Sequence, residues 1–445
     1  MSPRQAVTSQ PAVFDSRKPD VLSEQVLELA HNAGAEAAEV YQALSDATPV
    51  FFDANRVKRI ERSQTEAIAL RLWRQGRPGL AVAHGPIEPQ ALVDRAVAVS
   101  YLTLPETIEL APPKAVHYAD IGHAVPAETL TYWGKEAIAL VRDRYPDMLC
   151  YSEWSCESET TRLLNSKGLD YRYTDTTLSS YLSAERLRDG DFLNVSDGQT
   201  ERDALSPADL AEQIVQRIHW GRETVDAPQG RVPVLFTSKA ADMLWGTVQS
   251  ALDGRRVVER SSPWSDLVGE QVLSDRLTLS QQPRAGPFSC PFDDEGMPTR
   301  EITFIDRGML QLFYTDCTIG NRLGSGSTGN GFRPQLGGYP RPGLFNFLVE
   351  PGDRPLPDLI RHLDHGIIVD QMLGEDSGIS GDFSFNVDLG YRVENGCITG
   401  RIKNTMVAGN VYRALKHVEV GSDVQWNGPC YTPSIALWNL SVVSR

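Results

Sequence analysis

The sequence has few of the residues that build disulfide frameworks and metal sites. Six cysteines and eight histidines are spread over 445 residues. No two cysteines form a CxxC pair, and six are too few for a disulfide scaffold in a chain of this length. We therefore expect a protein of a reducing compartment, the cytoplasm, in which each cysteine acts as a small buried hydrophobic residue.

Long apolar runs and dense positive charge are also lacking. No run of about 18 apolar residues occurs, so no membrane-spanning helix is expected. The first twenty residues are polar and proline-dotted and lack the apolar core of a secretory signal. The formal net charge is −15, without a basic stripe to offset it. Because such a charge repels phosphate backbones, we expect no nucleic-acid partner.

The composition that remains is typical of a globular protein, with 41% apolar and 23% charged residues. A chain of this length is expected to form two or three domains. We predict a loose arm over residues 1–20, an N-terminal α/β domain over 21–227 and a mainly β C-terminal domain over 228–445. The main boundary falls at the linker Pro228-Gln229-Gly230.

Hydrophobic periodicity predicts a small sheet covered by helices in the N-terminal half. A helix beginning at Pro207 is well marked, because Ser206 can cap it and proline suits its first turn. The other predicted N-terminal elements are helices over 21–33 and 90–101, strands over 39–44, 56–61, 67–73 and 80–83, and a strand-rich region over 150–189.

The C-terminal half is predicted to be mainly antiparallel β structure with a few helices. An apolar strand over 232–236 precedes a helix over 238–252 that ends at Gly254. Two hairpins are expected, one over 302–314 and one over 391–402 that turns at Asn395-Gly396. Residues 324–343 are rich in glycine and proline and are predicted to be irregular. The fold class is therefore α+β.

Two motifs suggest ligands, but their context does not support them. His362 and His365 lie three residues apart, which on a helix would place them on one face. The pattern favours a polar helix end before Gly366 over a metal site. Residues 324–329 match the GxGxxG spacing of a phosphate loop. Because the sequence that follows cannot start the required helix, a mobile loop that closely approaches another backbone is favoured.

Two acidic loops leave both a chemical and a structural interpretation open. The run Phe292-Asp293-Asp294-Glu295-Gly296 could bind a cation or supply an acid–base pair, or its aspartates could cap backbone N–H groups. The loop Gly374-Glu375-Asp376-Ser377-Gly378, followed by Gly381-Asp382-Phe383-Ser384, is equally ambiguous. No GxSxG nucleophile motif occurs.

The order of several short motifs resembles the TldD/PmbA family. Each motif is weak alone, but their common order along nearly the whole chain is specific. In the N-terminal half the motifs are Arg56 to Ser63 and Ala69 to Gly79. In the C-terminal half they are Phe292 to Gly296, Ser327-Thr328-Gly329-Asn330, Asn346 before Glu350-Pro351-Gly352-Asp353, Gly381 to Ser384 and Ala408-Gly409-Asn410.

The resemblance implies a two-domain α+β fold and a peptidase built from two related subunits. The TldD-like subunit carries HExxxH and the catalytic zinc, whereas the PmbA or TldE subunit lacks that motif. The residues of this chain near the place of HExxxH are Trp245 at the first histidine, Gly246 at the glutamate and Ser250 at the second histidine. No histidine in the chain is directly followed by a glutamate. Because these residues cannot replace the ligands and base, this chain resembles the metal-free type.

The resemblance therefore implies a non-catalytic subunit that holds no cofactor and pairs with a TldD-like, zinc-bearing partner. It would shape a chamber for a peptide substrate, for proteolysis or for maturation of a peptide-derived metabolite. The family-motif residues that could line its cleft are Asp293, Asp294, Glu295, Gly296, Ser327, Thr328, Gly329, Asn330, Asn346, Gly381, Asp382 and Ser384.

Two other functions stay open. The chain could be a stand-alone peptide-binding protein. It could also be a hydrolase with a carboxylate centre drawn from Asp293, Asp294, Glu295, Asp376 or Asp382.

Overall fold

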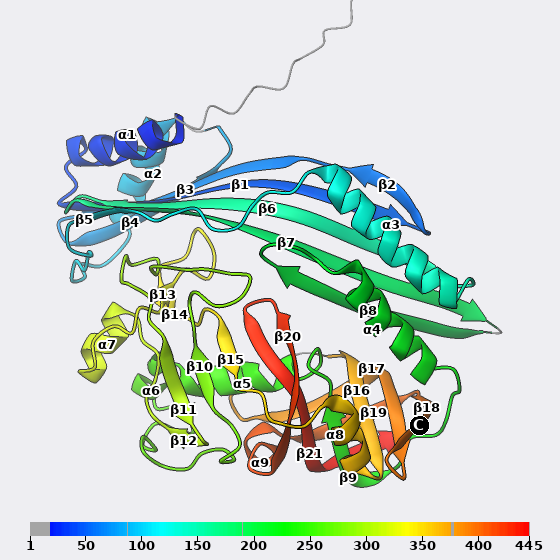
Figure 1. Cartoon of the computed structure of the whole chain (residues 1–445). Coiled ribbons are helices and arrows are strands. Elements are labelled where there is room, and N and C mark those ends of the chain that lie inside the picture. The colour runs from blue at the N-terminus through cyan, green and yellow to red at the C-terminus, as the bar shows by residue number, and fades with distance from the viewer. Residues whose placement is uncertain (1–17, 87, 189, 375–377, 445) are drawn as a thin grey trace, which may run out of the picture. The chain divides into compact units, whose positions relative to one another are not determined.

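The computed structural model describes residues 18–86, 88–188, 190–374 and 378–444 (Figure 1). These residues form two compact units. The first consists of the described residues up to Ala43 together with Glu66–Ala115 and Arg162–Tyr171, and the second consists of Leu44–Thr65, Val116–Thr161 and the described residues from Arg172 onward. The domain boundary predicted at residues 227 and 228 stays a prediction.

The helices and strands confirm the α+β class. The helices are α1 (Lys18–Asn32), α2 (Pro89–Ser100), α3 (Ala127–Arg144), α4 (Pro207–Trp220), α5 (Asp242–Leu252), α6 (Gly254–Val258), α7 (Cys317–Leu323), α8 (Leu356–Leu363) and α9 (Val411–Ala414). The strands of the first half are β1 (Ala37–Asp53), β2 (Arg56–Ile60), β3 (Ser63–Arg74), β4 (Arg77–His84), β5 (Lys114–His117), β6 (Leu149–Asn165), β7 (Leu169–Arg188) and β8 (Asp191–Glu201).

The strands of the second half are β9 (Gly230–Phe236), β10 (Leu279–Gln281), β11 (Ile302–Asp306), β12 (Met309–Leu310), β13 (Gly331–Phe332), β14 (Arg341–Pro342), β15 (Phe347–Val349), β16 (Gly366–Leu373), β17 (Asp382–Glu394), β18 (Cys397–Ile402), β19 (Thr405–Asn410), β20 (Val418–Asn427) and β21 (Cys430–Ser444). The strands of the first half form one sheet in the order β4-β3-β1-β6-β7-β5, with β2 beside β1 and β8 beside β7.

The first unit is held by an apolar cluster between two helices and strands. Val26 of α1 and Leu92 of α2 are fully buried, as are Ile68 and Leu70 of β3. Helix α2 packs on β4 and on α1. A Cβ at Gly79 of β4 would lie 2.0 Å from the carbonyl oxygen of Ala96, so only glycine permits this close approach of strand and helix.

The second unit is built on an eleven-stranded, mainly antiparallel sheet with both faces buried. Its strand order is β12-β11-β10-β15-β21-β19-β17-β16-β9, with β18 beside β17 and β20 beside β21, and β9 also pairs with β21. Two apolar clusters pack against this sheet. Val234 and Phe236 of β9 belong to one cluster, and Leu235 of the same strand belongs to the other. Because successive side chains of a strand point to opposite faces, this apolar run covers both sides of the sheet.

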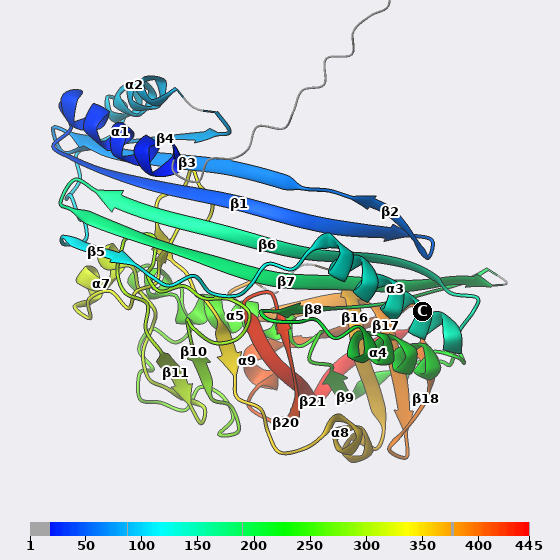
Figure 2. The ribbon, with the colours of Figure 1, turned by 45° about the horizontal axis from the view of Figure 1, so that its top comes forward.

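Helices cover both faces of this sheet. Helix α5 belongs to the cluster that contains Phe236. Residues of α3, α4 and α8 belong to the cluster that contains Leu235. Helices α3 and α4 pack against each other and lie side by side in Figure 2. The face with α4 and α8 is therefore the one that holds the pocket described below.

Several predicted boundaries were wrong for identifiable reasons. Helix α1 begins at Lys18, inside the predicted arm, whose residues 1–17 lie outside the described part of the chain. Helix α5 starts at Asp242 because residues 238–241 form a turn that bonds to the carbonyl of Thr237. Gly254 begins α6 instead of ending α5, since the Asp253 side chain accepts from the N–H of Arg255 and caps α6.

The predicted irregular stretch 324–343 contains β13 and β14, which pair antiparallel. Strand β12 stops at Leu310, short of the predicted Tyr314. Helix α3 and strand β8 were not predicted. By contrast, the Ser206 cap of α4 and the hairpin of β17 and β18, with Glu394 opposite Cys397, are confirmed.

No helix within the described residues is both long enough and apolar enough to cross a membrane.

Candidate functional site

Helix α5 carries the three residues that the resemblance places at the zinc motif. The Trp245 side chain is fully buried, and its indole Nε1 donates to the hydroxyl of Thr432 in β21 at 2.7 Å. Its ring lies 6.4 Å from that of Phe347, centroid to centroid. Trp245 is therefore part of the core of the second unit.

These residues do not fit a zinc ion. Indole carries only an N–H donor, glycine at 246 has no side chain, and the hydroxyl of Ser250 is a poor substitute for imidazole. Elsewhere in the described part of the chain, no three His, Cys, Asp or Glu side chains converge as metal ligands would. No chemical step on α5 can therefore be assigned to a metal held by these side chains.

The acidic loop around Asp293 holds backbone groups in place. The fully buried Asp293 carboxylate accepts from the N–H of Glu295 at 3.0 Å, of Met297 at 2.8 Å and of Gly331 at 2.8 Å. Burial and the neighbouring Glu295 raise the pKa of Asp293, whereas the N–H donors of Gly331 and Met297 oppose that rise. This geometry matches the structural interpretation of the acidic run.

The other two acids of this loop also accept from backbone N–H groups. The Asp294 carboxylate accepts from Arg333 at 2.6 Å, and the Glu295 carboxylate accepts from Cys317 at 2.8 Å. The loop turns at Gly296, whose φ is +78°. The three carboxylates thus tie the loop to the glycine-rich stretch and to α7.

The motif 327–330 is a buried hydrogen-bonded cluster. The Thr328 hydroxyl accepts from the N–H of Thr315 at 2.7 Å. The Asn330 amide donates to the Gln281 side chain at 2.6 Å and to the Gly343 carbonyl at 2.8 Å. The Ser327 hydroxyl accepts from the N–H of Gly329, where φ is +77°.

Gly329 makes the close backbone approach that the sequence predicts for this loop. A Cβ at this position would lie 2.3 Å from the carbonyl oxygen of Pro298. The mobility predicted for the same loop stays a prediction.

Asn346 holds the loop over residues 282–288 by hydrogen bonds. Its φ is +50°, and its buried amide donates to the carbonyls of Gln282, Ala285 and Phe288 at 3.2, 2.9 and 3.0 Å. A residue that satisfies three carbonyls from a left-handed conformation fixes the path of residues 282–288.

Residues 381–384 start strand β17 beside β19. Gly381 is buried against Tyr412, and Asp382 and Ser384 are exposed. The Asp382 carboxylate accepts from the Asn410 amide at 2.9 Å, directly across the ladder. The related candidate Asp376 lies outside the described residues. Asp382 and Asp293 thus serve separate local structures: Asp382 accepts from Asn410 across the ladder, and Asp293, beside Glu295, accepts from three backbone N–H groups.

The histidine pair does not share a helical face, as its spacing would allow. Helix α8 ends at Leu363, and Asp364 has a φ of +55°, so His365 lies beyond the helix. The His362 ring packs against Trp438, with centroids 6.1 Å apart. Among the cysteines, four are buried as predicted, but Cys397 is exposed in its hairpin and Cys317 is half-buried.

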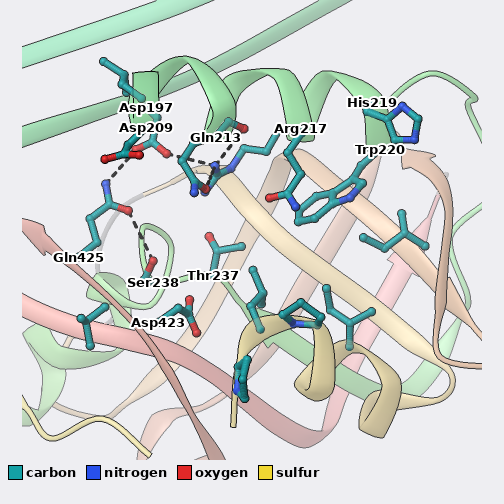
Figure 3. A pocket seen from close by; sticks show the side chains of 18 of the residues that line it. Asp197, Asp209, Gln213, Arg217, His219, Trp220, Thr237, Ser238, Asp423 and Gln425 are labelled. Atoms are coloured by element: carbon teal, nitrogen blue, oxygen red, sulfur yellow. Dashed lines mark hydrogen bonds and ion pairs between the residues drawn. The ribbon is translucent and has the colours of Figure 1, made fainter. Parts of the chain in front are cut away.

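The structure reveals a large pocket in the second unit that motif reasoning missed. Its volume is about 1290 Å³, and its walls come from β8, α4, α8, β20, the turn between β17 and β18, and the residues after β9 (Figure 3). Labelled wall residues include Asp197, Arg217, Thr237, Asp423 and Gln425. We call this cavity the α4 pocket.

A buried charge network lies beneath the α4 pocket. Arg217 donates to the Asp370 carboxylate at 2.7 Å and lies 3.2 Å from that of Asp197, and Lys239 donates to Asp370 at 2.9 Å. Burial alone would raise the pKa of Asp370, but Arg217 and Lys239 hold it at about 2. Burial would likewise lower the pKa of Arg217, and the two carboxylates raise it instead.

One sequence signal could have indicated this network. Asp370 directly follows the apolar run Ile367-Ile368-Val369 of a buried strand, where a carboxylate requires cationic partners. The identity of those partners depends on the fold, since Lys239 and Arg217 lie 131 and 153 residues away in sequence.

Comparisons with known proteins show which proteins this chain is similar to. Residues 229–444 match the family described as PmbA/TldA metallopeptidase C-terminal domain. The metalloprotease PmbA of Escherichia coli O157:H7 is 24% identical to this chain over 449 residues, and the match covers 94% of each protein. The zinc metalloprotease TldD homolog of Saccharolobus solfataricus is 31% identical over 129 residues, 29% of each chain.

The fold has a close structural counterpart. The crystal structure of TldE from Thermococcus kodakarensis superposes with a TM-score of 0.85 at 23% identity, covering 95% of this chain and all of that one. The fold of this chain is therefore that of TldE. The part of the chain that the family model matches, residues 229–444, belongs to the PmbA/TldD metallopeptidase family.

Proposed function

We propose that this chain is the metal-free, non-catalytic subunit of a TldD/TldE-type zinc metallopeptidase heterodimer. Helix α5 carries the proposal. At the place where the resemblance expects HExxxH, the chain has Trp245, Gly246 and Ser250, and Trp245 is built into the core through its bond to Thr432. The zinc belongs to a TldD-like partner.

In this proposal the subunit shapes a chamber that holds an extended peptide. Walls and strand edges can bind a peptide backbone without a metal. The family-motif residues contribute indirectly: Asp293, Asn330 and Asn346 hold the loops that form such walls. The division at residues 227 and 228 separates the two domains. The product is either a cleaved peptide or a matured peptide-derived metabolite.

Names of similar proteins support the proposal. One similar protein is called a metalloprotease PmbA and another a zinc metalloprotease TldD homolog, and the fold matches a protein called TldE. The occurrence of both kinds of relative is consistent with a pair of related subunits.

The test is co-expression of this chain with a TldD-like protein from the same source. We expect the two to co-purify and peptide cleavage to require both. Replacing the glutamate of the partner's HExxxH by glutamine should abolish cleavage, whereas Trp245→Phe in this chain should leave the catalytic rate of the pair unchanged because Trp245 touches no zinc.

Two experimental outcomes would each favour a different function. Peptide cleavage by the chain alone, lost on changing the carboxylates of Asp293 or Asp382, would indicate a carboxylate hydrolase. The chain would instead be a stand-alone binding protein if it bound the peptide by itself, formed no complex with the TldD-like protein, and bound the peptide no more tightly when that protein was added.

A further inference from the structure

The α4 pocket contains two buried oxygen atoms that lack a hydrogen-bond partner among the described residues. They are Oγ1 of Thr237 and Oδ1 of Asp423, and both residues line the pocket (Figure 3). The Thr237 side chain is 1% exposed. Leaving a buried polar atom without a partner is unfavourable, so two such atoms in the lining of one pocket indicate a ligand that donates hydrogen bonds.

The position of Asp423 is fixed by its neighbours. The Ser434 hydroxyl donates to Oδ2 of Asp423, and the N–H of Ser238 donates to the same hydroxyl at 3.0 Å. This chain of bonds holds the carboxylate and leaves Oδ1 for another donor. Burial raises the pKa of Asp423, whereas the Ser434 hydroxyl, backbone N–H groups and the charge of Arg217 oppose that rise, and a bound cation would oppose it further.

Two of the three arginines that line the pocket, Arg217 and Arg361, form ion pairs. Arg217 pairs with Asp370 and Asp197. At the rim, Arg361 pairs with Asp358, and the Arg222 guanidinium lies 5.6 Å from the centre of the Tyr145 ring.

The remaining charge of the lining is negative. Glu201, Asp209 and Glu223 line the pocket from exposed positions. Within the described ranges none of these three carboxylates forms an ion pair. Together with Asp423 they give the pocket an excess of unpaired acids, which favours a cationic ligand.

Aromatic rings complete the wall. Trp220, Trp426 and Tyr431 line the pocket, and the rings of Trp426 and Tyr431 lie 4.9 Å apart. A carboxylate together with aromatic faces is the combination that recognises an organic ammonium group, through an ion pair and cation–π attraction.

We propose that the α4 pocket binds an organic primary ammonium group, with Asp423 and Thr237 as acceptors. An ammonium carries three donors, enough for both orphaned oxygens. The pocket is larger than the 300–1,000 Å³ of ordinary small-molecule sites, so it accommodates a lysine side chain with its flanking peptide. The site lies wholly in this chain and does not depend on the proposed heterodimer.

The test is isothermal titration calorimetry of the full chain with three probes. These are acetyl-Gly-Lys-Gly-amide, the same peptide with norleucine in place of lysine, and n-butylamine. We expect the lysine peptide to bind and the norleucine peptide to bind at least tenfold more weakly, since a hydrogen bond to a charged group contributes about 1.5–3 kcal/mol. Binding of butylamine as tightly as the peptide would support the site and assign it to a free amine.

Two variants test the acceptors, with one matched control. Asp423→Asn should weaken lysine-peptide binding about ten- to hundredfold, and the isosteric Thr237→Val should weaken it severalfold. Asp266→Asn, at an exposed residue outside the lining, should leave binding unchanged. Equal binding of the lysine and norleucine peptides, or no binding of any amine at millimolar concentration, would overturn the proposal. Loss of heterodimer formation would not affect this result.

Discussion

The indole N–H of Trp245 donates to the Thr432 hydroxyl at 2.7 Å, which fastens α5 to strand β21 inside the core. This bond stands where the family resemblance expects a zinc-binding histidine. Trp245 is therefore a packing residue, and its substitutions should affect folding before they affect chemistry.

Substitutions at Trp245 should separate packing from hydrogen bonding. Trp245→Ala should lower the free energy of unfolding by about 3–5 kcal/mol because it leaves a large cavity. Trp245→Phe keeps a ring and loses one bond, and should cost about 1–2 kcal/mol from that bond. Urea unfolding of the purified chain measures both. Equal, negligible losses would show that Trp245 is not part of the core.

The ion pairs of Asp370 should dominate acid sensitivity beneath the α4 pocket. Asp370→Asn leaves Arg217 and Lys239 buried without their main counter-charge and should cost about 3–5 kcal/mol at pH 7. Asp358→Asn, which removes an exposed pair with Arg361, should cost less than about 1 kcal/mol.

The same carboxylate predicts a pH window. Its pKa is about 2 in the folded chain, below the ordinary value of 3.8. A lowered pKa stabilises the folded state above the unfolded value, so this contribution is complete above about pH 4 and is lost as the pH falls toward 2. Unfolding curves of the wild type and Asp370→Asn should therefore converge over that window. A constant difference down to pH 2 would contradict the assignment.

Two glycines of one loop offer a matched comparison. Gly326 and Gly329 have φ values of +71° and +77°, so alanine is strained at both. Only at Gly329 would a Cβ meet another backbone, 2.3 Å from Pro298 O, whereas at Gly326 nothing lies within 4 Å. Gly329→Ala should therefore destabilise the chain by about 1–3 kcal/mol more than Gly326→Ala in thermal unfolding. Equal losses would mean that the loop is not held against Pro298.

A carboxylate in place of the Asn346 amide should destabilise the folded chain. Asn346→Asp replaces an amide donor by an oxygen that faces three carbonyls and should cost at least about 3 kcal/mol. The control Asn439→Asp also has a positive φ, +66°, but is exposed, and should stay within about 0.5 kcal/mol of the wild type. Chemical denaturation distinguishes the two, and similar losses would argue against the buried role of Asn346.

Local signals in the sequence predicted much of the fold. Ser206 and Pro207 mark the start of α4, and Asn395-Gly396 marks the turn between β17 and β18, because caps and tight turns depend on neighbouring residues. Helix α3 was missed although Leu130, Ala137, Ile138 and Val141 carry helical spacing.

Contacts between distant residues could not be predicted in the same way. Asp293 and Gly331 lie 38 positions apart in the sequence, and no residue near Asp293 indicates that Gly331 is its partner. The α4 pocket draws Thr237 from the residues after β9 and Asp423 from β20, so its acceptors come together only once the sheet is assembled. The family-motif residues were predicted as cleft candidates, and several of them hold loops instead of presenting free groups.

Native mass spectrometry of this chain co-expressed with a TldD-like protein tests the central claim most directly. The proposal predicts a complex with one copy of each chain and one zinc ion, and a separated chain of this protein that carries no zinc. A chain that holds one tightly bound zinc ion by itself, or that forms no complex with the TldD-like protein, would contradict it.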